Sequence, residues 1–234
     1  MDIQELRKLD PQNFIGKRLS QTTILEWFKI CNAYLFHSGD PKEPHMELTS
    51  GKCSNGYFNC PEVLKHPNIN EILAHQLTQK LRENSIESVD WVIGSPYSGI
   101  TFSYEVAKAL GAIHSFTEKD PSDPKGKRMI WRRMTIPEDS VVLQVEELIT
   151  TSGTFKEVRR AVEEGNKYSV NFLSVVGTLV HRPPRLPAEY DGREVVALVE
   201  KEVWAVDQKD CPLCRAGSPR YRPKSHWGKL TGEK

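Results

Sequence analysis

The stretch that decides the fold runs from Ser140 to Val158 and reads SVVLQVEELITTSGTFKEV. Its apolar part, Val141 to Val145, is rich in β-branched residues and predicts a buried strand. Two adjacent carboxylates, Glu146 and Glu147, follow at the carboxyl end of that strand. A run of hydroxyls with one glycine, ITTSGT, comes next, and a helical pattern, FKEVRRAVEEG, follows it. Because unpaired N–H groups at a helix N-terminus favour an anion, this stretch predicts a phosphate site.

The same combination of strand, acid pair and hydroxyl loop resembles the phosphoribosyl-pyrophosphate loop of the type I phosphoribosyltransferases. The resemblance implies that Glu146 and Glu147 are catalytic and hold the ribose hydroxyls, directly or through Mg²⁺. It also implies that the loop binds phosphoribosyl pyrophosphate through Ile149, Thr150, Thr151, Ser152, Gly153 and Thr154. Family members usually carry an Asp in the acid pair, so Glu147 is a departure. The competing interpretation is an ordinary strand and helix with surface glutamates.

The length, amino-acid composition and net charge of the chain limit the classes of protein to which it could belong. The chain has 234 residues, 38% hydrophobic and 27% charged, with a formal net charge of +1. This describes a soluble protein and gives no reason to expect nucleic acid or a membrane as partner. The charged start, MDIQELRKLD, and the odd count of five cysteines favour a reducing, cytoplasmic location.

Strand-like and helix-like segments alternate along the chain. Helical spacing covers Thr22–Phe36, Asn68–Asn84 and about Ile100–Leu110, and strand-like runs cover Val89–Ser95, Ser169–Arg182 and Glu194–Val199. Alternation of this kind predicts a parallel sheet with a ligand at the carboxyl ends of its strands. We expect one domain over residues 1–234, with an N-terminal helix and hood at about 20–65. An α/β core at about 66–205 and a tail at 206–234 complete it.

The segment from Glu47 to Asn59 predicts a hairpin that places Tyr57 and Phe58 beside a ligand. It resembles the N-terminal hood of the orotate phosphoribosyltransferases, which lies over the base. One branch of that family usually has His where Cys53 stands. A hairpin with buried aromatic rings is the alternative interpretation.

The turn GSPYSGI, residues 94–100, resembles the pyrophosphate-binding loop of the same family. The resemblance implies that backbone N–H groups of this turn face the leaving group, and that phosphoribosyl pyrophosphate contacts Ser95, Tyr97, Ser98 and Gly99. Some members have a lysine where Ser98 stands, so one positive charge is missing here. An ordinary strand-to-helix turn remains the alternative.

Residues 117–137 form the basic segment of the chain, and three turn-forming residues make its first half a loop. Phe116–Asp120 and Met129–Arg133 resemble the flexible loop that closes over pyrophosphate in the orotate family. The resemblance implies catalytic roles for Lys119, Arg132 and Arg133, and phosphoribosyl-pyrophosphate binding by Lys127 and Arg128. We expect a mobile flap outside the core that works on the neighbouring site of a homodimer. A solvated charged surface is the alternative.

The strand ending in V-H-R carries Arg182, and a guanidinium fork fits a carboxylate bidentately. Orotate enzymes commonly have Asp where His181 stands, and their arginine at the next position reaches the carboxylate of the base. The resemblance therefore implies a base site formed by Tyr57, Phe58, Thr150 and Arg182. Near the C-terminus, Cys211 and Cys214 form the only C-x-x-C, which is half a zinc site, and no second pair at ligand spacing accompanies it.

Five motifs from about Leu48 to Pro219 follow the order of the orotate phosphoribosyltransferases. The resemblance implies a type I phosphoribosyltransferase fold with an N-terminal hood. It also implies transfer of a phosphoribosyl group from phosphoribosyl pyrophosphate to orotate in pyrimidine biosynthesis, with Mg²⁺ held at Glu146 and Glu147. Two alternatives remain open: a phosphoribosyltransferase for another base, and a sensor that binds phosphoribosyl pyrophosphate without turnover. Departures at Cys53, Ser98, Glu147 and His181 keep the sensor open as an alternative.

Overall fold

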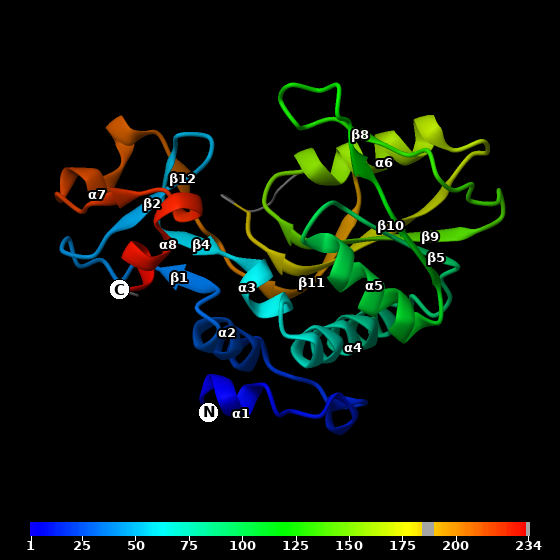
Figure 1. Cartoon of the computed structure of the whole chain (residues 1–234), viewed down its shortest axis with the longest axis horizontal. Helices are drawn as coiled ribbons and strands as arrows, with labels where there is room; N and C mark the ends of the chain where they lie inside the picture. The colour runs from blue at the N-terminus through cyan, green and yellow to red at the C-terminus, as the bar shows by residue number, and fades with distance from the viewer. Residues whose placement is uncertain (184–189, 233–234) are drawn as a thin grey trace.

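The computed structural model describes residues 1–183 and 190–232. Its central sheet has five parallel strands in the order β11-β10-β9-β5-β6 (Figure 1). These strands are β5 (Trp91–Gly94), β6 (Ile113–Phe116), β9 (Val141–Ile149), β10 (Asn171–His181) and β11 (Glu194–Glu200). The predicted α/β class with a parallel sheet is confirmed.

Alternate side chains of the central strands enter two different cores. Val92, Leu143 and Val145 are fully buried in the larger core, on the face covered by α4 (Pro67–Glu83) and α5 (Gly99–Leu110). Their sequence neighbours Trp91, Ile93 and Val142 pack in the second core under α6 (Gly153–Gly165). Figure 1 shows α4 and α5 on one side of the sheet and α6 on the other. Burial on both faces explains why these strands read as continuous apolar runs.

The order of the strands creates a switch point beside β5. The chain passes from β5 through α5 to β6 on one side, and later returns to β9 on the other side of β5. The turns that follow β5 and β9 therefore leave the sheet in opposite directions at the same edge. In open α/β sheets ligands bind at such a point. Residues 95–98 and 150–152, both singled out in the sequence, are these two turns.

A second lobe, the hood, is built from segments far apart in the sequence. Its sheet has the order β12-β3-β2-β13, and β1 pairs antiparallel with β4 beside it (Figure 1). The strands are β1 (Tyr34–Phe36), β2 (His45–Glu47), β3 (Cys53–Ser54), β4 (Gly56–Phe58), β12 (Ala205–Val206) and β13 (Arg220–Tyr221). The segment taken from the sequence as a C-terminal tail, residues 206–234, thus supplies one edge strand, β13, and begins within the other, β12.

The helix predicted over Thr22–Phe36 is too long. Helix α2 spans Gln21–Ile30 and is capped by Ser20, whose Oγ accepts from the N–H of Thr23 at 3.1 Å. It stops because Asn32 has a left-handed φ of 51°, and the aromatic residues after it form β1. Strand propensity and pairing with β4 win over the helical spacing here. The predicted helix over Asn68–Asn84 is confirmed as α4.

The hairpin predicted from Glu47 to Asn59 is only partly correct. Strands β2 and β3 form an antiparallel hairpin, but β4 leaves it and pairs with β1. Phe58 is buried in the core, where its ring lies 4.5 Å from that of Tyr34. Its predicted contact with a base does not fit this position, because successive residues of a strand face opposite sides. Tyr57, on the other side, remains partly exposed.

The basic flap is anchored in the core by its second half. Met129, Trp131 and Ile136 are buried in the second core beneath α6, so the expectation that the whole segment lies outside the core is wrong. Two short antiparallel strands, β7 (Glu118–Lys119) and β8 (Met129–Ile130), form the base of the flap. The loop between them, residues 120–128, is the part that projects.

Short helices complete the described part of the chain. They are α1 (Ile3–Leu6), the 3₁₀ helices Pro11–Phe14 and Gln208–Asp210, α3 (Cys60–Leu64), α7 (Pro212–Arg215) and α8 (Pro223–Thr231). Within residues 1–183 and 190–232, every helix falls short of the length and apolar character that a membrane crossing requires.

Candidate active site

The two acids lie within β9 near its carboxyl end. As adjacent residues of a strand, they face opposite sides of the sheet. Glu146 is buried and accepts hydrogen bonds from Ser95 Oγ and from Gln144 Nε2, the latter at 2.7 Å. Glu147 Oε1 accepts from Ser98 Oγ at 2.9 Å. A Cβ at Gly99 would lie 2.9 Å from Glu147 Oε2, so a larger residue there would require this carboxylate to shift. The turn after β5 therefore binds both acids through its side chains.

Both acids resist ionisation in this arrangement. Burial, followed by the neighbouring charge of Glu147, raises the pKa of Glu146 to about 8. Burial likewise raises the pKa of Glu147. A cation close to these oxygens would favour their charged forms, because opposite charge counteracts desolvation and like-charge repulsion.

Glu146 is held in place by a chain of hydrogen bonds that the sequence did not reveal. Gln144 donates to it and in turn accepts from Arg159 Nε of α6 at 3.0 Å. Arg159 is buried, donates to the carbonyl of Leu173, and lies over the ring of Phe172 at 4.5 Å. Burial lowers the pKa of this arginine. The single polar residue in the apolar run of β9 was the available signal for this network.

The hydroxyl loop leads directly into α6 and is open to solvent. Ser152 precedes the first residue of the helix and makes no side-chain capping bond, so the N-terminal N–H groups are not capped by it. Nothing described lies within 4 Å of a Cβ built at Gly153. Thr151 and Thr154 are exposed, and Thr150 is half-buried. An open N-terminus of a 13-residue helix is a suitable anion site.

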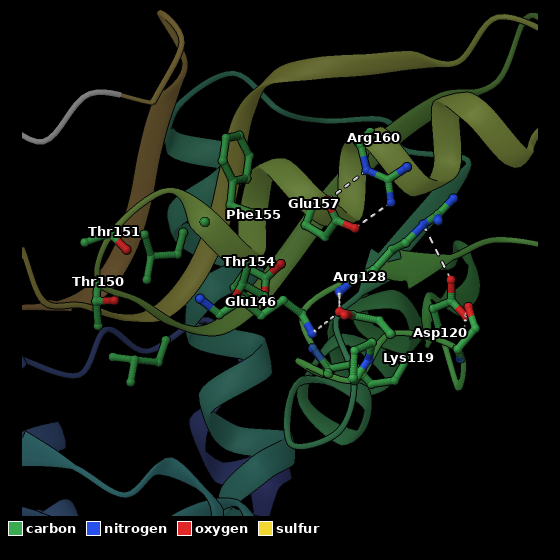
Figure 2. Close-up of a pocket in the computed structure, with 18 residues that line it drawn as sticks. Lys119, Asp120, Arg128, Glu146, Thr150, Thr151, Thr154, Phe155, Glu157 and Arg160 are labelled. Atoms are coloured by element: carbon green, nitrogen blue, oxygen red, sulfur yellow. Dashed lines mark hydrogen bonds and ion pairs between the residues drawn. The ribbon is translucent and has the colours of Figure 1, made fainter. Parts of the chain in front are cut away.

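A cavity of about 830 Å³ lies between this loop and the flap. Its lining includes Glu146 and the loop residues Ile149, Thr150, Thr151, Gly153 and Thr154, together with the flap residues Lys119, Lys127 and Arg128. Figure 2 shows Thr150 and Thr151 on one side of the cavity and Lys119 and Arg128 toward the other. The flap wall keeps its shape through Asp123, which accepts from the backbone N–H groups of Lys127 and Arg128, both at 2.7 Å. Three flap cations thus face one buried acid and one helix N-terminus within a single chain.

Two other predicted flap residues lie elsewhere. Arg132 and Arg133 are exposed and pair with Glu118, at 3.2 Å and 2.5 Å. The structure of one chain does not bring them to the cavity lining. Tyr97, predicted to contact phosphoribosyl pyrophosphate, has a side chain that is 75% exposed.

A half-buried arginine, Arg182, lies on the opposite side of the strand ends. The backbone N–H of Arg182 donates to the carbonyl of Ile149 at 2.7 Å, which places this residue next to the hydroxyl loop. Its Nη1 donates to the carbonyl of Gly56 at 3.3 Å, whereas its buried Nε has no hydrogen-bond partner among the described residues. Tyr57 lies close enough to influence the pKa of Arg182, which burial lowers. A buried N–H without a partner is costly and points to a missing acceptor.

No family model matches the chain, but curated proteins of known name are similar to it over most of its length. The orotate phosphoribosyltransferase of Pelotomaculum thermopropionicum is 37% identical over 181 residues, which are 77% of this chain and 88% of that protein. This chain belongs to the orotate phosphoribosyltransferase family. The family member from Caldicellulosiruptor bescii is 30% identical over 207 residues, covering 88% of this chain and 98% of that protein.

A solved structure agrees on the fold. The crystal structure of orotate phosphoribosyltransferase from Aeropyrum pernix covers 75% of this chain and 92% of its own, with a TM-score of 0.54 and 16% identity. At that identity the likeness concerns the fold alone. The predicted family and the predicted fold are both confirmed.

The cavity of this family member includes an ion pair that the motifs did not indicate. Glu157 and Arg160, one turn apart on α6, line the wall and pair with each other (Figure 2). Glu157 also accepts from the N–H of Met129 at 2.8 Å, and Arg160 donates to the carbonyl of Met129 at 2.9 Å. The pair therefore fastens the base of the flap to the helix that follows the hydroxyl loop. Their i, i+3 spacing was visible, but their partner in the flap was not.

Glu146, the acid of the pair that lines the cavity, suits a hard divalent cation. Mg²⁺ prefers carboxylate oxygens and is usually held through one or two of them together with substrate phosphates. Glu146 lies at the cavity wall, and each of its oxygens has a second lone pair beyond the bond it accepts. The donor set is therefore compatible with such an ion.

Proposed function

We propose that this chain transfers the 5-phosphoribosyl group from phosphoribosyl pyrophosphate to orotate, giving orotidine 5′-monophosphate and pyrophosphate in pyrimidine biosynthesis. The observation that carries the proposal is the cavity in which Lys119, Lys127 and Arg128 face Glu146 across an open helix N-terminus. A substrate with a phosphate at one end, ribose hydroxyls in the middle and a pyrophosphate beside them matches this order of groups. Family membership supports the choice of reaction.

Each part of the substrate has a candidate partner. Thr150, Thr151 and Thr154 and the first N–H groups of α6 bind the 5′-phosphate, because oriented N–H groups and hydroxyls favour an anion there. Glu146 and Glu147 hold the ribose hydroxyls. The flap cations neutralise charge that develops on the departing pyrophosphate.

The base occupies the side of the strand ends where Arg182 lies. A carboxylate on the base would give the buried Nε of Arg182 the acceptor it lacks, and the ring of Tyr57 would cover the plane of the base. A carboxylate also neutralises the guanidinium charge and fits it bidentately, which a neutral purine does not. Arg182 therefore favours orotate over a purine.

Catalysis in this proposal rests on positioning rather than on a covalent nucleophile. The sugar carbon exchanges pyrophosphate for the base nitrogen, and the residues bind both reactants in line. Mg²⁺ at Glu146 and Glu147, directly or through water, would supply charge to offset the pyrophosphate. Ser95, Ser98 and Gln144 orient the two acids for this task.

The test is an assay of purified protein with Mg²⁺, phosphoribosyl pyrophosphate and one of orotate, uracil, adenine or hypoxanthine, with pyrophosphate release as the readout. We expect release with orotate only, and its loss in Glu146→Gln. The exposed Glu26 on α2 provides the matched control, and Glu26→Gln should keep full activity. Release with adenine instead would contradict the proposal. Binding of phosphoribosyl pyrophosphate by calorimetry without release for any base would make the chain a sensor.

We further propose a cytoplasmic homodimer that has no nucleic-acid or membrane partner. Lys119, Lys127 and Arg128 reach the cavity of their own chain, so a role across the dimer would fall to Arg132 or Arg133. Arg132→Ala and Glu146→Gln chains, each inactive alone, should regain activity on subunit exchange if Arg132 serves the partner's site. About a quarter of all sites would then be free of both changes. No recovery after confirmed exchange would assign Arg132 to its own chain or to the surface.

A further inference from the structure

A cluster of three cysteines and one histidine lies in the hood, away from the cavity described above. His45 of β2, Cys53 of β3, and Cys211 and Cys214 at the start of α7 place their ligand atoms within 4.8 Å of one another. Cys53 Sγ lies 3.6 Å from Cys214 Sγ. His45 Nε2 lies 3.7 Å from Cys211 Sγ and 3.4 Å from Cys214 Sγ. The C-x-x-C is thus completed by two residues from the other end of the chain.

These distances match the edges of a tetrahedral zinc site. With Zn–S bonds of about 2.3 Å and a Zn–N bond of about 2.0 Å, ligand atoms lie about 3.8 Å apart for two sulfurs and about 3.5 Å apart for sulfur and nitrogen. Three measured separations fall within about 0.2 Å of these values. The four ligands are of the types found in structural Cys₃His sites.

The cluster has no other satisfactory explanation within the hood. His45, Cys53 and Cys211 are completely buried, and thiols are weak hydrogen-bond donors. A disulfide between Cys53 and Cys214 would use two of the sulfurs and leave Cys211 and the Nε2 of His45 without a strong partner. One metal ion satisfies all four ligand atoms together.

The surroundings orient the ligands for a metal. His45 Nδ1 lies 2.9 Å from Ser218 Oγ, and this hydroxyl donates to the carbonyl of Glu43 at 2.7 Å. The Ser218 hydroxyl is committed to that carbonyl, so it accepts from Nδ1–H and leaves Nε2 unprotonated toward the sulfurs. A metal-bound histidine typically donates its other N–H in this way. Arg220 Nη1 approaches Cys53 Sγ at 3.8 Å, and the N–H of Cys214 donates to Cys211 Sγ at 3.4 Å.

We propose that His45, Cys53, Cys211 and Cys214 bind one structural zinc ion that fastens the C-terminal segment to the hood. Binding releases the three thiol protons to solvent, and three thiolates with Zn²⁺ carry a net charge of −1, which Arg220 offsets. Four protein ligands leave no open position, so the ion has no catalytic role. It fixes α7 and β13 to the strands that precede Tyr57. Figure 1 shows α7 and β2 together in the hood.

The direct test is the zinc content of the protein purified under reducing conditions from zinc-supplemented medium. We expect one zinc per chain by elemental mass spectrometry, and less than a tenth of that in Cys53→Ser and Cys211→Ser. Cys31→Ser is the matched control, because Cys31 is also buried but lies at the end of α2, outside the cluster. It should keep its zinc. The measurement needs no substrate, so its outcome is independent of the enzymatic proposal.

A second readout does not depend on whether the variants fold. Wild-type protein loaded with Co²⁺ should show the intense visible bands of a tetrahedral site and the ultraviolet charge-transfer band of thiolate ligands. Wild-type protein without zinc that also fails to bind Co²⁺ would overturn the proposal. So would a Cys53–Cys214 disulfide in the native protein, seen as the loss of two hydrogens, or a Cys211→Ser variant that folds and retains a full equivalent of zinc.

Discussion

Two buried polar clusters of this molecule contrast in how they are satisfied. In the core, Arg159, Gln144, Glu146 and Ser95 form a continuous chain of hydrogen bonds in which each member meets a strong partner. The hood cluster consists of Cys53, Cys211, Cys214 and His45, whose side chains face one another. Its three thiols can donate only weak hydrogen bonds. Since buried polar groups are normally paired, the first cluster is held by strong protein partners, with only Nη1 of Arg159 unpaired among the described residues, whereas the second is satisfied only with an ion. The contrast separates polar groups that serve positioning from groups that await a ligand.

The largest effect is expected when the hood cluster loses its metal. Removing the metal from wild-type protein with a strong chelator should lower the melting temperature by roughly 10 °C or more, since loss of a structural metal costs several kcal/mol and about 1 kcal/mol corresponds to 2–4 °C at this size. Differential scanning calorimetry measures it. The chelator should not lower the melting temperature of Cys211→Ser further, and it should act on Cys31→Ser as on wild type. An equal response of all three proteins would contradict a role for the cluster.

The next effect concerns the ionisation of the core cluster. The pKa of Glu146 rises from 4.5 to about 8 on folding, so the folded state binds its proton more tightly than the unfolded state. Its contribution to stability is therefore present below pH 4.5 and is lost as the pH rises toward 8, by at most about 1.4 kcal/mol per pH unit. Urea unfolding without divalent cations should show this decline in wild type and in Glu26→Gln. The decline should be shallower in Glu146→Gln, and identical slopes would disprove the assignment.

A smaller effect tests whether the core chain needs its arginine. Arg159→Met keeps most of the apolar stem but leaves Gln144 and the carbonyl of Leu173 without donors. We expect a loss of about 2–3 kcal/mol in the free energy of unfolding, because buried acceptors lose their partners. The Michaelis constant for phosphoribosyl pyrophosphate should rise as well, since Gln144 no longer orients Glu146. Lys167→Met, at an exposed position, is the control; wild-type stability and kinetics in Arg159→Met would refute the network.

Arg182 sharpens the comparison, because it resembles the hood cluster in having a buried donor that lacks a partner. Arg182→Ala should raise the Michaelis constant for orotate about tenfold or more, as expected for a lost charged hydrogen bond of about 1.5–3 kcal/mol. The constant for phosphoribosyl pyrophosphate should change much less. Steady-state kinetics with each substrate varied in turn measures both. Equal increases for the two substrates would make Arg182 a structural residue.

The sequence predicted those features whose residues are contiguous in the chain. Glu146 to Thr154 spans nine residues on one strand, loop and helix start, so its elements and its place at the sheet edge followed from pattern alone. The partners of Cys211 and Cys214 lie far earlier in the chain, at His45 and Cys53. A lone C-x-x-C therefore gave only half a site.

Local patterns also failed where tertiary contacts decide. The helical spacing after Ile30 is genuine, yet the left-handed Asn32 and pairing with β4 turn Tyr34–Phe36 into a strand. The charged composition of the basic flap predicts a solvated segment throughout, yet Trp131 is buried because α6 covers it. Arg159, in a helix of charged residues, gave no sign that it would be the buried one. Such residues are fixed by which elements meet, and a single segment does not contain that information.

The hood sheet also has a consequence for how the protein is made. Its inner strands, β2 and β3, are synthesised early, whereas the edge strands β12 and β13 that pair with them follow long after. All five strands of the core sheet precede β12, so that sheet is complete before the hood can close. The side of the molecule that carries Tyr57 is therefore assembled last, and a chain interrupted after residue 204 would have a core without a finished hood. The hood therefore closes onto a core sheet whose strands were all synthesised earlier.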